Sequence, residues 1–196
     1  FATAADYDGA DETARRFFQA IQNKMLWAVT RHTAAELILE RADASKSNMG
    51  LTSWAGNRVR KADAVIAKNY LAENEARELD RLVSAFLDLG ADRAERRQQT
   101  TMAEWASFVD QYLKLAEREI LTHAGAVSHD RMLTIVDARY GAFDAARREA
   151  ERRAAEVEHE QEIDAELRRA EVEATKGRRL TEAKGGKASR RKGVGE

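Results

Sequence analysis

The sequence contains no cysteine, no proline and no long apolar run, and each absence narrows what the chain can be. Without cysteine it can form neither a disulfide nor a thiolate zinc site, which fits a reducing compartment. Without proline no interior position carries an obligatory helix break. No apolar stretch approaches the roughly 20 residues that a membrane-spanning helix needs. We therefore expect a cytoplasmic protein with no membrane partner.

The sequence also lacks an excess of either positive or negative charge, although charged residues are abundant. Lys and Arg number 33 against 34 Asp and Glu, for a formal net charge of -1. The chain as a whole has no bias toward nucleic acid or membranes, so a local patch must recognise any electrostatic partner. The chain begins at Phe1 without a signal-peptide pattern. This start indicates an internal cut and the C-terminal part of a longer soluble protein.

Helix-forming residues are what the sequence has in excess, because alanine, leucine, glutamate and arginine dominate it. Apolar residues recur at three- and four-residue steps, the period of a buried helix face. Thr33 and Thr101 are each followed three residues later by Glu, which predicts capping boxes at two helix starts. The pattern predicts helices over residues 11–30, 33–44, 61–70, 73–98, 101–116 and 128–143. The fold class is therefore all-α, a compact bundle of about five or six helices around a common apolar interior.

Composition divides the chain into four parts. Residues 1–10 lack periodicity and predict a leader, and residues 11–143 form the helical domain. Residues 144–174 alternate Glu and Arg, with apolar residues too sparse for a heptad seam, which predicts a solvated helical arm with i,i+4 charge pairs. Residues 175–196 carry eight cations against two anions among glycines. Their net charge of +6 predicts a disordered basic tail.

Residues 45–60 read as a connection, because turn residues such as Gly50 and Gly56 punctuate them. Trp54, Val59 and other apolar residues make this segment too apolar for a free linker. We predict a packed loop, and packed loops often line a site. Trp54, like Trp27 and Trp105, is interpreted as a core or loop anchor.

Amide and ammonium groups on helices that otherwise face a core suggest a shared polar pocket. Such a pocket can bind an anion, for example a phosphate or a carboxylate. The pocket candidates are Asn23, Lys24, His32, Glu36, Arg41, Asp43, Lys61 and Asn69. A structural alternative stays open, since Asn23 and Asn69 can equally hydrogen-bond neighbouring backbone and fix the packing.

His32 and Glu36 stand at i,i+4 spacing, which can present an imidazole and a carboxylate to a metal ion or form an acid–base pair. The capping box already uses Glu36, and His32 lies just before the cap, so a structural role is favoured. A metal site would need His123 or His129 from a distant turn, where a bond to backbone is the simpler explanation. We predict no metal and no cofactor, and assign no catalytic residue.

The basic tail and the charged arm are two further candidate surfaces. Cations neutralise phosphates whatever the base sequence, so the tail can bind nucleic acid nonspecifically. The tail residues concerned are Lys176, Arg178, Arg179, Arg190, Arg191 and Lys192. The arm can meet a protein partner or a second copy of the chain. The alternative in both cases is a solvated segment without a partner.

A series of short motifs follows in one register along the chain. They are Phe17-Phe18-Gln-Ala-Ile-Gln22-Asn23-Lys24, Trp27-Ala-Val, His32-Thr-Ala-Ala-Glu36, Arg41-Ala-Asp43, Asn48-Met-Gly50-Leu51, Lys61-Ala-Asp63 on to Leu71, and Leu121-Thr-His123-Ala-Gly125 on to His129. In these motifs the sequence resembles the C-terminal half of the RhuM family of bacterial virulence proteins, over about residues 6–143. The arm and the tail lie outside this resemblance.

The resemblance implies more about organisation than about chemistry. Members of the family look like two-part proteins whose N-terminal region resembles phage antirepressor or DNA-binding modules. They are associated with mobile elements or pathogenicity islands, and the family has no agreed biochemical activity. Some relatives are joined to Fic-type domains, but a chain without proline cannot carry the Fic His-Pro-Phe motif.

The function expected from these observations is that of a non-enzymatic regulatory or effector domain. It would act with an N-terminal nucleic-acid-binding region, and a nucleic acid would be the partner of that region or of the tail. Two alternatives stay open. One is an enzyme or toxin with a pocket around Lys24, His32 and Asn69. The other is a structural oligomerisation module that works through the arm.

Overall fold

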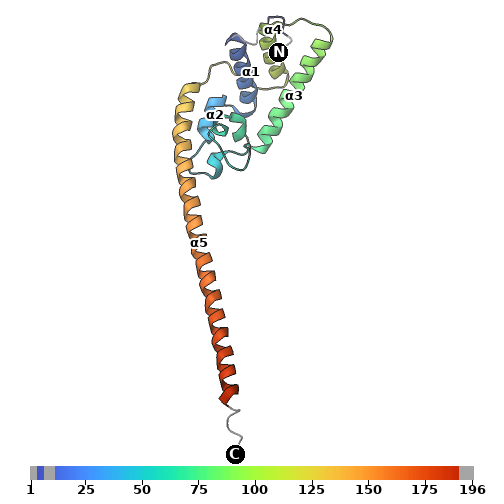
Figure 1. Cartoon of the computed structure of the whole chain (residues 1–196). Coiled ribbons are helices and arrows are strands. Elements are labelled where there is room, and N and C mark those ends of the chain that lie inside the picture. Colours follow the sequence, from blue (N-terminus) through green and yellow to red (C-terminus); the bar gives the residue numbers. More distant parts are fainter. Residues whose placement is uncertain (1–3, 7–11, 190–196) are drawn as a thin grey trace, which may run out of the picture. The chain divides into compact units, whose positions relative to one another are not determined.

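The computed structural model describes residues 4–6 and 12–189, without the side chains of residue 13 and residues 174–189. All regular elements in these residues are helices (Figure 1). The five α-helices among them are α1 (Glu12–Thr30), α2 (Ala34–Arg41), α3 (Glu73–Glu95), α4 (Met102–Leu115) and α5 (His129–Ser189). The predicted all-α class is therefore confirmed. The chain divides into two compact units, Phe1–Phe143 and Asp144–Glu196.

Three short 3-10 turns occupy the connection between α2 and α3. They are η1 (Ser47–Gly50), η2 (Asp63–Val65) and η3 (Ala67–Tyr70), so the continuous helix expected over residues 61–70 is wrong. Bonds from side chains to backbone compete with the helical ladder here. Asn69 Nδ2 donates to the Asp63 carbonyl at 3.0 Å, and the Tyr70 hydroxyl donates to the Ala64 carbonyl at 3.0 Å.

The helix starts follow the capping chemistry of the sequence. The Thr33 and Thr101 side chains accept from the backbone N–H of Glu36 and Glu104, and each glutamate accepts in return from the threonine N–H. Both predicted capping boxes are confirmed. Helix α3 starts after Ala72, which has no capping oxygen, and Glu75 alone accepts the Ala72 N–H at 2.8 Å.

Helices α3 and α4 end without proline and without glycine. The residue after each C-cap, Arg97 or Glu117, adopts a left-handed conformation with φ 55°. After α3, the Gln98 N–H donates to the Arg93 carbonyl at 3.2 Å, and the corresponding bond after α4 is 2.9 Å long. These are Schellman motifs, which satisfy carbonyls that the helix end would leave without a partner.

Two apolar clusters, and not the single common interior expected, hold the first unit. Helices α1, α3 and α4 lie together around one cluster (Figure 1). Helix α2, the connection and the first turns of α5 surround the other. Leu37 belongs to the first cluster and Ile38 to the second, so adjacent residues of the short helix α2 pack into different clusters. The interior divides because α2 is buried on two sides.

The connection packs against the second cluster, as predicted. Met49 is fully buried and Val59 is 2% exposed. The turn η1 requires three successive left-handed residues, Asn48, Met49 and Gly50. A Cβ at Gly50 would lie 2.4 Å from the Arg41 carbonyl oxygen, so only glycine lets the turn close on the end of α2.

Both ends of the chain are described only in part. Ala5 N–H donates to the Thr100 carbonyl at 3.1 Å, and Asp6 accepts from the Met102 N–H at 2.8 Å. Residues 1–3 and 7–10 of the predicted leader lie outside the described residues. The helical backbone of α5 continues to Ser189, past the predicted arm boundary at residue 174. The last tail residues, 190–196, also lie outside the described residues.

The second unit carries the charge pairs expected of a solvated helix. Arg148 Nη2 lies 2.6 Å from Asp144 Oδ2, and Arg153 Nε lies 2.9 Å from Glu149 Oε1, both at i,i+4 spacing. Such exposed pairs each contribute a few tenths of a kcal/mol, roughly 0.2–0.5. They stabilise the helix without an apolar seam.

Two leucines on α4 test the packing of the first cluster. Leu113 is fully buried, whereas Leu115 is 82% exposed on the same helix. We expect Leu113→Ala to lower the free energy of unfolding by about 2–5 kcal/mol, because it removes buried surface and leaves a cavity. Leu115→Ala, the matched control, should change it by less than about 0.5 kcal/mol. Urea denaturation measures both, and equal effects would contradict the described packing.

Candidate functional site

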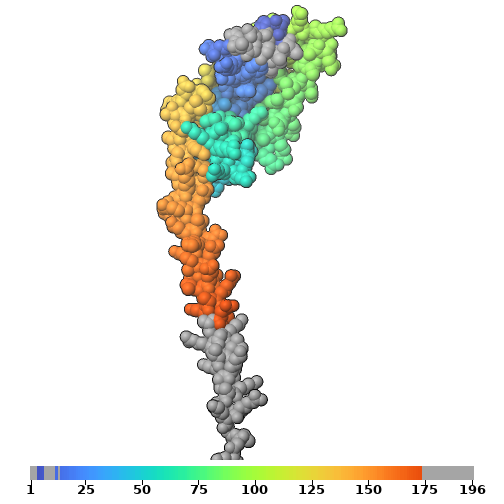
Figure 2. Space-filling model, viewed as in Figure 1, coloured from blue at the N-terminus to red at the C-terminus, as the bar shows by residue number. Residues whose placement is uncertain are grey.

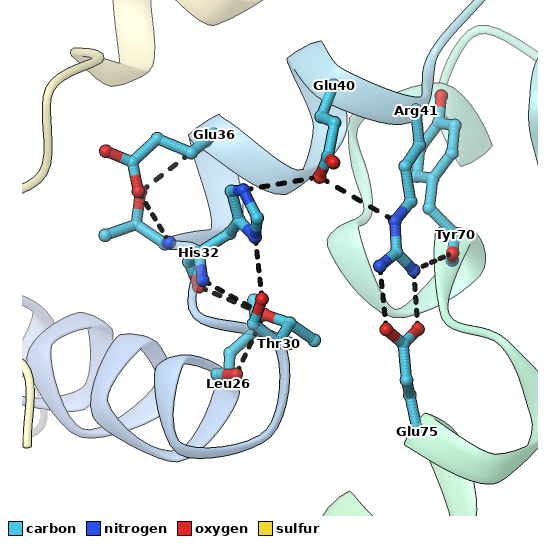
Figure 3. A network of polar contacts seen from close by, with 9 residues as sticks. Leu26, Thr30, His32, Glu36, Glu40, Arg41, Tyr70 and Glu75 are labelled. Atoms are coloured by element: carbon cyan, nitrogen blue, oxygen red, sulfur yellow. Dashed lines mark hydrogen bonds and ion pairs between the residues drawn. The ribbon is translucent and has the colours of Figure 1, made fainter. Parts of the chain in front are cut away.

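A chain of polar contacts runs from the end of α1 across α2 to the start of α3, and we call it the elbow network. Its side chains are those of Thr30, His32, Glu40, Arg41 and Glu75 (Figure 3). Two of the predicted pocket residues, His32 and Arg41, are members. The network forms because the chain turns between α1 and α2, and the His32 ring in this turn reaches both the end of α1 and the last turn of α2.

The His32 ring joins the end of α1 to the last turn of α2. Its Nδ1 lies 2.7 Å from the Thr30 carbonyl oxygen, and its Nε2 lies 3.4 Å from Glu40 Oε2. A carbonyl oxygen can only accept, so Nδ1 carries the proton in this contact. Nε2 can donate to Glu40 only when the ring holds a second proton. The predicted pair of His32 with Glu36 is replaced by a pair with Glu40.

Arg41 and Glu75 form the strongest contact of the network. Nη1 and Nη2 of Arg41 lie 2.5 and 2.7 Å from the two carboxylate oxygens of Glu75, and Nη1 also donates to the Tyr70 carbonyl at 2.8 Å. The side chains are 27% and 18% exposed. The hydrogen bonds from Arg41 hold the pKa of Glu75 below its usual range, and those to Glu75 raise the pKa of Arg41. Both groups therefore stay charged, and the pair ties α2 to η3 and α3.

Glu36 lies at the other end of α2 and joins three segments. Its Oε2 accepts from the Thr33 N–H and hydroxyl, each at 2.8 Å, and its Oε1 accepts from the Ala126 N–H at 2.6 Å. Burial raises the pKa of this carboxyl, but the bonds from Ala126 and Thr33 outweigh burial, so the pKa is lowered. A carboxylate held in this way is a weak proton acceptor near neutral pH.

Gly125 allows the turn after α4 to approach the start of α2. Its φ is 90°, and a Cβ there would lie 3.0 Å from Thr33 Cγ2. Nearby, the His123 Nδ1 accepts from the Gly125 N–H at 3.1 Å, and the ring meets Trp27 edge to face at 5.0 Å. His123 therefore stabilises the turn with a backbone bond, although its partner is an N–H and not a carbonyl.

Asn23 and Lys24 on α1 each hold a different neighbour. Asn23 Oδ1 accepts from the Ala34 N–H at 3.0 Å, at the first residue of α2. Lys24 Nζ lies 2.6 Å from Asp110 on α4, and the two side chains are 20% and 36% exposed. Asn23 and Lys24, which are adjacent in sequence, thus connect α1 to two different helices.

The three remaining pocket candidates each have a different partner. Asp43 accepts from the Ser45 hydroxyl and N–H at 2.7 and 2.9 Å, and these bonds lower its pKa. Lys61 pairs with Asp137 on α5. Asn69 bonds the Asp63 carbonyl within the connection. The eight candidates therefore meet partners on separate elements, and the shared pocket stays a prediction.

Residues 1–151 match the virulence protein RhuM family. The chain belongs to this family. The match covers the whole first unit and the first residues of the second. It confirms the resemblance seen in the motifs from Phe17 to His129. No curated protein and no solved structure matches this RhuM-family chain.

Sequence reasoning missed several residues that complete the contacts of this RhuM-family domain. Glu40, Glu75 and Asp110 supply the anionic partners of His32, Arg41 and Lys24, and Arg139 donates to the Leu39 and Ala42 carbonyls at 2.6 and 2.7 Å. Glu75 carried a local signal, since it stands at the N3 position of α3. Glu40 also had one, since it lies on the same face of α2 as Glu36, whereas Asp110 and Arg139 had none because their partners are distant in sequence.

Metal, membrane and tail sites can be assessed only for part of the RhuM-family chain. Among the side chains that are described within residues 4–6 and 12–173, no group of three or more His, Asp or Glu is placed to hold a metal ion. No helix there has both the length and the apolar character for a bilayer crossing. The six tail residues predicted to touch nucleic acid lie beyond the described side chains, so that prediction is untested.

The Arg41–Glu75 pair predicts a specific acid dependence of stability. We expect Glu75→Gln to lower the free energy of unfolding by about 1–3 kcal/mol at pH 7, because it leaves Arg41 without its carboxylate. The pKa of Glu75 is lowered in the folded state. Its contribution is therefore complete above the unfolded pKa of about 4.3 and disappears as the pH falls through the folded value.

Urea denaturation of both proteins between pH 7 and pH 3 measures this difference. It should stay constant down to about pH 5 and then shrink. Glu73→Gln is the matched control, because Glu73 is 85% exposed on the same helix turn and should leave stability unchanged. A difference that grows in acid would contradict the assignment.

Proposed function

We propose that this chain is a non-enzymatic regulatory or effector domain of a RhuM-family protein. It acts in the cytoplasm, together with a nucleic-acid-binding region N-terminal to it. The observation that carries the proposal is that the carboxylates best placed for chemistry, Glu36 and Glu75, are both engaged by structural hydrogen bonds. The family match supports the setting in a virulence-associated protein.

Acid–base catalysis requires a group that changes protonation near the working pH. Glu36 and Glu75 have lowered pKa values, so their environments move them away from that range. The cation Arg41 is held by two bonds to Glu75, and Lys24 by Asp110. Polar groups in such fixed geometry position helices against one another, which suits a domain that acts by binding.

A thermal-shift screen tests this proposal on the full chain. The panel contains nucleotides, inorganic phosphate, small carboxylates and divalent cations, and the comparison protein is His32→Gln/Glu40→Gln. A ligand at 100 times its dissociation constant stabilises a protein by about 2.7 kcal/mol, a large shift in melting temperature. We expect that any ligand that raises the melting temperature of the wild-type protein raises that of the double variant equally.

A ligand that stabilises only the wild-type protein would contradict the non-enzymatic proposal. It would support instead the enzyme or toxin with a pocket near Lys24, His32 and Asn69. Asp92→Asn is a matched control for the loss of an exposed carboxylate, since Asp92 pairs with Arg96 in the last turns of α3, far along that helix from Glu75.

One observation favours a second candidate function, an oligomerisation module. The arm exposes four apolar side chains, Val157, Ile163, Leu167 and Val172, each 45–58% exposed. A second helix packed along the arm would bury these four side chains and gain the free energy of removing them from water. The occupant under this candidate is a second copy of the chain.

Sedimentation equilibrium of the full chain and of Ile163→Ser/Leu167→Ser tests the second candidate. Oligomerisation through the arm predicts a mass above that of one chain, which falls to one chain in the double variant. Leu115→Ser is the matched control, because Leu115 is 82% exposed outside the arm and should leave the mass unchanged. A monomeric full chain would rule out this candidate.

A further inference from the structure

The connection between α2 and α3 carries an excess of positive charge. Its residues 42–72 hold five cations against two anions, a net charge of +3 in a chain of net charge -1. The cations are Lys46, Arg58, Arg60, Lys61 and Lys68. Of the two anions, Asp43 accepts from the Ser45 N–H and hydroxyl, and Asp63 is only 8% exposed and accepts the Arg60 backbone N–H at 2.9 Å. They therefore balance only part of the charge at the surface.

Several cations of the first unit outside the connection have carboxylate partners, whereas among the described side chains of the connection Lys61 alone forms an ion pair. Arg31 pairs with Glu119 at 2.8 Å, and Arg118 with Glu78 at 2.5 Å. Arg58, Arg60 and Lys68 are all exposed, and none has an ion-pair partner within the part of the chain whose side chains are described. Their charge is thus available to an external anion.

We define the basic loop surface as Trp54, Arg58, Arg60 and Lys68. The Asn69 carbonyl accepts from the N–H groups of Thr52 and Ser53 at 2.7 and 3.3 Å, so Lys68 lies beside the first residues of the loop. A Cβ at Gly56 would lie 3.8 Å from Arg60 Nη2, which places that guanidinium against the loop's glycine turn. Figure 2 shows the later part of the connection, in teal, on the visible face of the unit.

This surface rests on a fixed base. Val59, between the two exposed arginines, is 2% exposed in the second cluster, and its carbonyl accepts from the Tyr140 hydroxyl at 3.5 Å. Trp54 is half-buried against the same cluster. One part of the indole is anchored and the rest remains accessible. A surface held in place loses little conformational entropy on binding.

We propose that the basic loop surface binds single-stranded nucleic acid. Arg58, Arg60 and Lys68 would contact successive phosphates, since guanidinium groups bind phosphate oxygens in pairs and ammonium groups bind them as point charges. An unpaired base would stack on the accessible part of Trp54, as bases do on aromatic side chains in sequence-tolerant sites. The exposed Ser53 and Asn57 are residue types that donate to phosphate and sugar oxygens.

Two other anionic partners fit the surface less well. A membrane surface is bound by an amphipathic helix with a continuous apolar face, and this segment is a loop with short 3-10 turns. An acidic peptide would use the cations but would give Trp54 no specific partner. The inference goes beyond the proposed function, because it places a nucleic-acid contact on this domain and independently of the tail.

Fluorescence anisotropy with a labelled oligothymidylate and the full chain tests the proposal. Arg58→Ala/Arg60→Ala should weaken binding by roughly ten-fold and reduce the slope of log affinity against log salt by about 1.4, the value for two phosphate contacts. Arg77→Ala/Arg96→Ala is the matched control. Arg77 and Arg96 lie next to α3 or on it and are 68% and 67% exposed, so their substitution removes the same charge from another part of the surface. The control should stay within about two-fold of wild type.

Trp54 is tested by a pair of substitutions that both keep an apolar side chain on the second cluster. Trp54→Phe can still stack on a base and should stay within about three-fold of wild type, whereas Trp54→Leu cannot and should bind roughly ten-fold more weakly. Melting curves of all variants, measured by circular dichroism, confirm that each protein is folded.

Several results would overturn the proposal. One is an Arg58→Ala/Arg60→Ala variant that binds as tightly as the control variant. If binding is then lost on substituting Arg190, Arg191 and Lys192, the nucleic acid binds the tail and not the basic loop surface. Others are tighter binding to duplex than to single-stranded oligonucleotide, and binding to phosphatidylserine vesicles or polyglutamate without binding to nucleic acid. None of these results bears on the ligand screen at the elbow network.

Discussion

The bidentate ion pair between Arg41 and Glu75 closes the connection between α2 and α3, and the rest of the first unit depends on that closure. Both side chains are less than a third exposed, and a third bond from Arg41 brings the Tyr70 carbonyl to the same point. Since the two ends of the connection are held together, its apolar residues can stay in the second cluster. Its cations, which cannot be buried without partners, are left at the surface.

The ionisable groups of the unit are divided between structure and surface. Glu36, Glu75 and Glu104 each accept backbone N–H groups at a helix start. Their pKa values are lowered against burial, by the bond from Arg41 above all for Glu75 and by bonds from backbone and threonine for the other two. Fixed anions of this kind stabilise helix ends. Arg58 and Arg60 are exposed and have no ion-pair partner among the described side chains. This division is typical of a domain that works by contact with a charged partner.

Much of the fold could be predicted from local rules. The starts of α2 and α4 follow from Thr33 and Thr101, and the apolar period gave α1, α3 and α4 within a few residues. The ends of α3 and α4 could not be predicted, because Arg97 and Glu117 occupy left-handed positions that glycine usually fills. The candidate site was predicted only by residue type. Asn23, Lys24 and Arg41 were named as pocket candidates, but their partners Ala34, Asp110 and Glu75 belong to other helices and could not be identified from the residue pattern.

The sequence by itself determined that this protein is helical, that its charged and apolar patterning changes after Phe143, and that it resembles the RhuM family. These properties depend on composition, short-range period and ordered motifs. Only the tertiary structure decided which polar side chains meet, that the interior divides into two clusters at Leu37 and Ile38, and that Arg58 and Arg60 have no ion-pair partner among the described side chains. The reason is physical: hydrogen bonds and ion pairs act over a few ångströms, and residues far apart in sequence reach that range only after the chain has folded.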